Sequence, residues 1–232
     1  MLFKQLFHEE SCTYTYLIAC SKTNDAALID PVNTEIDDYI ALLGEHDLTL
    51  KYALDTHVHA DHITASGLLK KTLDCQTGVS ALCGANNPDI HIKDGDVFEI
   101  SEFESITTIS TPGHTAGSVC FLWRDHLFTG DTLLIGGCGR TDFQGGDASQ
   151  LYDGITQRLF TLSDDTLVYP GHDYKGQFVS NIVQERLGNP RLANKTKAEF
   201  IEIMDNLNLP YPKLIDIAVP ANRDCGVIIQ SA

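Results

Sequence analysis

Residues 56–62 read Thr-His-Val-His-Ala-Asp-His, which places three histidines and one carboxylate within a single short segment. Residues two apart in an extended chain point the same way, so His57 and His59 can face one point. Asp61 and His62 diverge from them as the following helix begins. Imidazole and carboxylate groups together suit zinc or iron. The segment therefore favours a metal site over the alternative, a solvated histidine-rich loop.

The sequence on either side of this segment predicts that it joins a strand to a helix. Residues 51–56, KYALDT, read as a short strand, and residues 63–74, ITASGLLKKTLD, have the apolar spacing of a helix. Loops at the ends of strands commonly carry binding and catalytic residues.

Three later segments repeat this design, in which a β run meets a glycine or Pro-Gly break and then a ligand-type side chain. ITTISTPGH ends at His114, HLFTGD ends at Asp131, and TLVYPGH ends at His172. A single His or Asp after a turn is usually a capping or surface residue. Four such breaks in one chain instead indicate a metal centre built from separate loops.

The rest of the chain predicts strands in blocks separated by few helices. Strands are expected at 13–19, 26–30, 97–100, 105–110, 118–123, 126–130 and 166–170, and helices at 34–46, 149–162, 178–187 and 196–207, before proline-punctuated coil. Two sheets covered by outer helices fit this order better than a doubly wound parallel sheet. With 232 residues, of which 43% are hydrophobic, the chain fits one domain, residues 1–232, that includes a C-terminal helical segment.

Charge and cysteine usage narrow the function classes. The net charge of −16 argues against binding to nucleic acid or to an anionic membrane, since both need a basic surface. No apolar run approaches the length of a bilayer span, and residues 1–16 lack a signal or transit pattern. The seven cysteines include no C-x-x-C pair, which indicates a reducing compartment. We therefore expect a cytoplasmic protein.

The motifs H-x-H-x-D-H, TPGHT-x-G, FTGD and YPGH, taken together, resemble the metal motifs of the metallo-β-lactamase superfamily. The resemblance implies an α+β fold, an αββα sandwich of two face-to-face sheets with outer helices and a site along one edge. The generic ligands of that superfamily would hold two metals, with His57, His59 and His114 around one, Asp61, His62 and His172 around the other, and Asp131 bridging. Such a pair activates water for hydrolysis, as in the related glyoxalase II thioesterases.

The segment GDTLLIGGCGRTDFQGG at 130–146 is similar to the persulfide dioxygenase (sulfur dioxygenase) family, and so are NPRL, NLNLPYPKLID and AVPANRDCG in the tail. This resemblance implies one Fe(II) per chain, with His57, His114 and Asp131 as its ligands and as the catalytic residues. Two histidines and one carboxylate are the ligand set of non-haem Fe(II) oxygenases, and they leave coordination positions open. The remaining candidates, His59, Asp61, His62 and His172, would then orient the ligands or hold water.

The activity implied by this resemblance is a dioxygenase that oxidises glutathione persulfide with O2 and water to sulfite and glutathione. The alternative is a glyoxalase II-like hydrolase of glutathione thioesters that uses two zinc ions. The family resemblance also makes a homodimer plausible. No rhodanese-like extension follows Ala232, so a sulfurtransferase partner would be a separate chain.

Glutathione carries two carboxylates, so an acidic chain needs local positive charge to receive it. Residues 174–197 contain five basic side chains against one acid, Glu185. Arg140, just after the Asp131 loop, is the first candidate for contacting substrate, because the guanidinium fork suits a carboxylate. An internal ion pair of Arg140 with an acid such as Asp142 is the alternative. Arg191 and Tyr174 are further substrate candidates.

Overall fold

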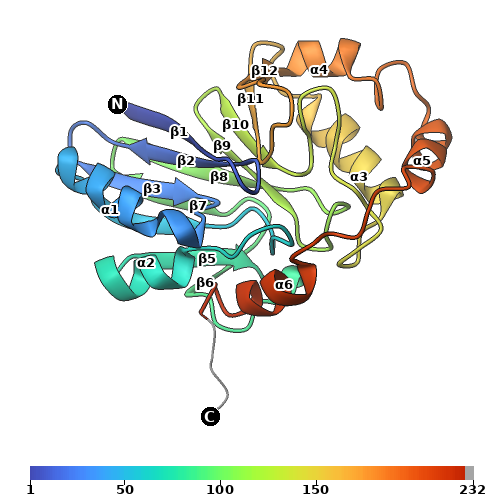
Figure 1. The fold of residues 1–232 in the computed structure, drawn as a ribbon. Helices are drawn as coiled ribbons and strands as arrows, with labels where there is room; N and C mark the ends of the chain where they lie inside the picture. Colours follow the sequence, from blue (N-terminus) through green and yellow to red (C-terminus); the bar gives the residue numbers. More distant parts are fainter. Residues whose placement is uncertain (228–232) are drawn as a thin grey trace.

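Two six-stranded sheets pack face to face, with helices on the outer sides (Figure 1). The computed structural model describes residues 1–227. This arrangement confirms the predicted α+β fold with two sheets and outer helices. Within the described residues, no helix combines the length and apolar character needed to cross a membrane.

The first sheet contains the N-terminal strands. In spatial order they are β1 (Leu2–His8), β2 (Thr13–Ala19), β3 (Asp25–Ile29), β4 (Thr49–Leu54), β5 (Gln76–Ser80) and β6 (Ile90–Ile92). Antiparallel pairing joins β1, β2 and β3, and parallel pairing continues from β3 to β6.

The second sheet follows in the sequence. In spatial order its strands are β12 (Ser180–Asn181), β11 (Leu167–Pro170), β10 (His126–Gly130), β9 (Val119–Trp123), β8 (Glu104–Ser110) and β7 (Val97–Ser101). Its pairs are antiparallel except β10 with β11, which is parallel.

Helices cover the outer faces of both sheets. They are α1 (Ile36–Glu45), α2 (Ser66–Leu73), α3 (Ala148–Gly154), α4 (Ile182–Gly188), α5 (Lys197–Asp205) and α6 (Ile215–Arg223), with 3-10 turns at Asn33–Glu35 and Ala81–Cys83 and a π-helical turn at Ile155–Leu159. Successive side chains of a strand point to opposite faces. Tyr16 and Ile18 of β2 therefore enter the core between the sheets, while Leu17 packs with Tyr39 and Leu43 of α1.

Two predicted segments differ in the structure. Residues 178–187 were expected to be helical throughout, but β12 pairs with β11 and the helix begins only at Ile182. The proline-punctuated tail was expected to be coil, yet it contains α6 with Pro220 inside the helix. Burial of Ile215 and Val219 against Val58 stabilises this helix despite the hydrogen bond that proline removes.

Candidate metal centre

The predicted ligands lie on four loops, each of which follows a strand. His57 follows β4, His114 follows β8, Asp131 comes directly after β10, and His172 comes after β11. One ligand atom from each of His57, His114 and Asp131 lies within 4.8 Å of the others. The structure therefore brings together three side chains that stand far apart in the sequence.

A glycine allows two of these loops to approach closely. Gly130, the last residue of β10, has a φ of +47°, and a Cβ atom there would lie 2.4 Å from Oγ1 of Thr56. Any other residue would be strained by its backbone angle and would also clash with Thr56. Gly130 therefore lets Asp131, which follows it, lie beside the segment that begins at Thr56.

The orientation of His114 is set by a backbone carbonyl. Its Nδ1 lies 2.7 Å from the carbonyl oxygen of Arg140, and since a carbonyl can only accept, the Nδ1 atom carries the hydrogen. The neutral ring then has its lone pair on Nε2, the nitrogen that lies 3.6 Å from Oδ2 of Asp131. His114 thus offers Nε2 to a metal beside the carboxylate.

A chain of hydrogen bonds orients His57 in the same way. The hydroxyl of Thr56 donates to Oδ2 of Asp30 at 2.8 Å, and the backbone N–H of Thr56 donates to Oδ1 at 2.7 Å. The only hydroxyl hydrogen is therefore used, so the 2.9 Å contact between Thr56 Oγ1 and His57 Nδ1 requires the imidazole to donate. His57 also keeps Nε2 free as a ligand atom.

The charge states of these groups fit a metal ion. Burial lowers the pKa of His57 well below its usual range, and the neighbouring His59 and His114 act in the same direction. Burial would raise the pKa of Asp131, but His172 and His114 outweigh it and hold that pKa below its usual range. A neutral imidazole and an ionised carboxylate are the forms that bind metals, so the residues present fit a bound cation.

His172 joins two carboxylates. Its Nδ1 lies 2.7 Å from Oδ1 of Asp131, and its Nε2 lies 2.9 Å from Oδ2 of Asp61. Burial lowers the pKa of His172, yet the two carboxylates outweigh it and raise that pKa well above its usual range. A protonated His172 donates from both nitrogens and holds Asp131 through Oδ1, while Nε2 of His114 lies near the other carboxylate oxygen, Oδ2. The hydroxyl of Thr13 also donates to Asp61, at 3.0 Å.

His59 and His62 each have one ring nitrogen bonded to a carboxylate. His59 Nε2 lies 3.1 Å from Oδ1 of Asp30, and His62 Nδ1 lies 2.9 Å from Oδ2 of Asp61. Their other nitrogens, His59 Nδ1 and His62 Nε2, are buried and have no hydrogen-bond partner within residues 1–227. Buried polar atoms are normally satisfied, so these two nitrogens have the capacity to bind water, and either can bind a metal when it carries no hydrogen.

Of the predicted substrate residues, Arg140 is already paired. Its Nε and NH2 donate to the Asp142 carboxylate at 2.6 and 2.7 Å, and its NH1 donates to the carbonyl of Pro210 at 2.8 Å. The guanidinium also lies 4.7 Å from the centre of the Phe143 ring. The internal ion pair that the sequence left as an alternative is therefore present, and the substrate role of Arg140 stays a prediction.

The other two substrate candidates differ in accessibility. Arg191 is partly buried and donates through NH1 to the carbonyl of Cys138 at 2.6 Å. Tyr174 is 70% exposed, and its ring stacks on that of His172 with 5.8 Å between centroids. Tyr174 is thus the candidate that reaches solvent next to the metal centre.

Sequence reasoning assigned no role to Asp30, Thr56 and Thr13, whose side chains contact the candidate site residues. Asp30 and Thr56 stand just after β3 and β4, so the strand-end signal that found the ligands could have found them too. Thr13 opens β2, where its type is common, and no pattern singles it out.

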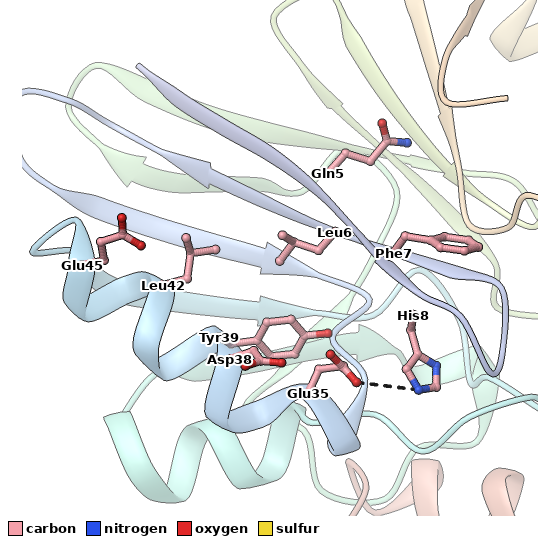
Figure 2. A pocket seen from close by; sticks show the side chains of 9 residues that line it. All are labelled: Gln5, Leu6, Phe7, His8, Glu35, Asp38, Tyr39, Leu42 and Glu45. Carbon is pink, nitrogen blue, oxygen red and sulfur yellow. Dashed lines mark ion pairs between the residues drawn. The ribbon is translucent and has the colours of Figure 1, made fainter. Parts of the chain in front are cut away.

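A cavity of about 470 Å³ lies away from this centre, between β1 and α1 (Figure 2). Its wall includes Leu6, Leu42, and a 3.8 Å contact between His8 and Glu35. None of the predicted site residues lines it. The size of this cavity is therefore no guide to the position of the metal centre.

Comparison with known protein families identifies the superfamily that has this fold and these metal motifs. The model of the metallo-beta-lactamase superfamily matches residues 12–172, so the chain belongs to that superfamily. This confirms the superfamily predicted from the four motifs.

Full-length relatives define the family more closely. The human protein named persulfide dioxygenase ETHE1, mitochondrial, is 50% identical over 100% of this chain and 91% of its own length. The crystal structure of ETHE1 from Myxococcus xanthus matches with a TM-score of 0.96 and 53% identity, and the match covers 98% of this chain and 100% of that one. The chain is a member of the persulfide dioxygenase family, as residues 130–146 and the tail predicted.

The alternative family is a weaker match. Hydroxyacylglutathione hydrolase of Polaromonas sp. is 35% identical, but the alignment covers 69% of this chain and 62% of that one. The comparison therefore favours the dioxygenase family over the thioesterase.

Proposed function

We propose that this enzyme oxidises the terminal sulfur of glutathione persulfide with dioxygen and water, and that the products are sulfite and glutathione. Dioxygen supplies two oxygen atoms of sulfite and water supplies the third, and the sulfur–sulfur bond breaks to leave the thiol. The enzyme class follows from the family, while the glutathione carrier and the iron cofactor are our proposals.

The observation that carries the proposal is the convergence of His57, His114 and Asp131, whose ligand atoms lie within 4.8 Å of one another. Two neutral imidazoles and one carboxylate are the ligands of non-haem iron(II) oxygenases, which keep other positions open. Bound iron(II) would supply the activation of dioxygen and the contact to the persulfide sulfur.

The surrounding residues orient these ligands. The carbonyl of Arg140 and the hydroxyl of Thr56 each accept an Nδ1–H, which directs Nε2 of His114 and His57 to the metal. His172 holds Asp131 at 2.7 Å. His59, Asp61 and His62 would complete the hydrogen-bonded surroundings or hold water. Arg140, Arg191 and Tyr174 are the residues we propose for the glutathione part, and exposure beside His172 favours Tyr174.

A specific observation supports the second candidate, a zinc thioesterase with two metals per chain. Ligand atoms of His59, Asp61 and His62 also lie within 4.8 Å of one another, and the free nitrogens of both histidines are buried. This cluster differs from the generic two-metal set, which places His59 with His57 and His114 and places His172 with Asp61 and His62.

Oxygen uptake separates the two candidates. The protein is loaded with iron(II) under anaerobic conditions. Glutathione persulfide is then added in oxygenated buffer, and oxygen consumption and sulfite formation are measured in parallel. An S-acylglutathione serves as the competing substrate. One O2 molecule consumed for each sulfite formed supports the dioxygenase. Thioester hydrolysis without oxygen uptake would transfer the assignment to the hydrolase.

The cytoplasmic location, a homodimer and a separate sulfurtransferase stay predictions. The human relative carries the word mitochondrial in its name, so the compartment of this chain needs its own measurement. Fractionation of the source cells with an antibody to the protein would provide it.

A further inference from the structure

Asn222, near the end of α6, contacts the backbone of the metal loop, residues 57–64, through both polar atoms of its side chain. Its Nδ2 donates to the carbonyl of His59 at 2.9 Å and to the carbonyl of His62 at 2.8 Å. Its Oδ1 accepts the backbone N–H of Thr64 at 2.9 Å. Two carbonyls can only accept and one N–H can only donate, so a single orientation of the amide satisfies all three groups.

This contact is buried and spans a long distance in the sequence. Asn222 is 3% exposed and stands 163 residues from His59. A buried carbonyl or N–H without a partner destabilises a protein by about 1 to 3 kcal/mol. The amide of Asn222 therefore satisfies three groups that the loop would otherwise leave unpaired at the metal centre.

The two carbonyls belong to His59 and His62, whose rings lie at the candidate metal centre. His59 and His62 are the residues with a buried, unpartnered ring nitrogen. The His59 ring lies 4.1 Å from that of His57 and 4.3 Å from that of His62, measured between centroids. Each side chain is attached to its backbone, so a shift of the backbone of residues 59–62 would move the rings of His59 and His62. The His57 ring, which packs against that of His59, would move with them.

We propose that Asn222 is a positioning residue, which acts through the backbone of residues 59–64 to hold the rings of His59 and His62, and through the His59 ring the ligand His57, in place. The inference rests on the proposed metal centre. Asn222 lies outside residues 12–172, the part matched by the superfamily model, so its contacts connect the tail of the chain to the site.

Other contacts fix α6 without Asn222, so the contribution of this amide can be isolated. Ile215 and Val219 pack on Val58 and Val79, and the N–H of Gly67 donates to the carbonyl of Cys225 at 2.8 Å. Figure 1 shows α6 beside α2 and the first sheet. A variant at Asn222 should therefore keep the helix in place.

The test compares Asn222→Asp with Asn86→Ala. Asn222→Asp keeps the size and the acceptor for Thr64 but removes both donors, so a carboxylate oxygen would face two carbonyls. Asn86 donates to Asp224 at 3.0 Å at an exposed position, so Asn86→Ala removes a tail contact that does not touch the loop. Affinity for Co(II) is measured by chelator competition, together with the visible absorption of the bound ion and the melting temperature with and without Co(II).

We expect Asn222→Asp to weaken Co(II) binding about 10- to 100-fold, to change the visible spectrum, and to shrink the rise in melting temperature on metal binding. Asn86→Ala should leave all three unchanged. A variant that melts earlier without metal but binds Co(II) with wild-type affinity and spectrum would assign Asn222 a purely structural role and overturn the proposal.

Hydrogen exchange of the unmodified protein decides the question if Asn222→Asp fails to fold. We expect Co(II) to increase the protection of the Thr64 amide and of the α6 amides together. Protection that rises at Thr64 while α6 stays unchanged would overturn the proposal. Neither measurement uses substrate or oxygen, so a failure of the dioxygenase assignment would leave this result intact.

Discussion

The Nδ1 atom of His114 lies 2.7 Å from the carbonyl oxygen of Arg140. This arginine therefore contacts the metal centre through its backbone, while its guanidinium pairs with Asp142. A side-chain substitution at Arg140 should consequently leave the metal ligands oriented, which separates a substrate role from a structural one.

Arg140→Ala should raise KM for glutathione persulfide about tenfold or more while the metal content stays unchanged. The physical reason is the loss of a charged hydrogen bond to a substrate carboxylate, which is worth about 1.5 to 3 kcal/mol. Asp142→Asn is the matched control, because it breaks the same ion pair and leaves the guanidinium free. Equal KM values in both variants and the wild type would reduce Arg140 to a surface ion pair.

Thr56→Val should weaken metal binding, and Thr56→Ser should preserve it. Valine has nearly the same shape but cannot accept from His57 Nδ1 or donate to Asp30. Loss of such an orienting contact typically costs 10- to 100-fold in metal affinity. Titration of the metal-free variants with Co(II) measures this. Equal affinities for valine and serine would show that the hydroxyl does not orient His57.

The number of metal ions per chain can be measured by replacing one histidine in each of the two clusters, His57–His114–Asp131 and His59–Asp61–His62. With one iron per chain, His57→Ala should lose the metal, while His62→Ala should retain close to one equivalent. With two zinc ions per chain, the metal content of both His57→Ala and His62→Ala should fall below the two equivalents of the wild type. Elemental analysis after gel filtration gives the ratio. Full metal content in His57→Ala would contradict the proposed ligand set under either reading.

Glu104 provides a pH prediction away from the metal centre. It accepts from Arg124 Nε at 3.0 Å and from Trp123 Nε1 at 2.9 Å. The bond from Arg124 lowers the pKa of this carboxyl, with burial opposing it. A depressed folded-state pKa stabilises the fold above the unfolded-state pKa of about 4.3, and this stability is lost as pH falls through the folded-state value.

Glu104→Gln should therefore cost about 1 kcal/mol of unfolding free energy near neutral pH, a value kept small because the Arg124 side chain is 53% exposed. The difference from wild type should shrink as the pH falls below about 4. Urea unfolding in the presence of a chelator measures both proteins free of metal. A difference that stays constant with pH would rule out the charged form of Glu104 as its source.

The strand-end pattern predicted the ligand loops because each ligand follows a buried strand and a break. That signal is local, so it singled out His114, Asp131 and His172 as candidates without any knowledge of how the sheets pack. The helix α6 was missed because Pro220 argues against a helix locally, whereas its stability comes from burial of Ile215 and Val219 on a distant strand-end segment. Likewise, residues 180–181 pair with β11, and this long-range contact outweighs their helical spacing.

The surroundings of the candidate ligands were harder to predict than the candidates themselves. Asn222 holds His59 through a contact between segments 163 residues apart. It lies within AVPANRDCG, but that local pattern does not indicate which segment its side chain contacts. The pairing of Arg140 with Asp142 could be anticipated because the two are neighbours, but its second bond, to the carbonyl of Pro210, depends on the path of the tail. The presence of an arginine in the sequence does not show whether its guanidinium is already paired within the protein or free to bind a substrate.

The bond from Asn222 to His59 also orders events during synthesis of the chain. After His59 the ribosome adds 163 residues to reach Asn222, which takes roughly 10 to 30 seconds at typical elongation rates. During that interval the nascent loop carries its histidines without the amide that holds their backbone. On the proposed role of Asn222, the metal loop has its full set of backbone partners only after α6 has left the ribosome.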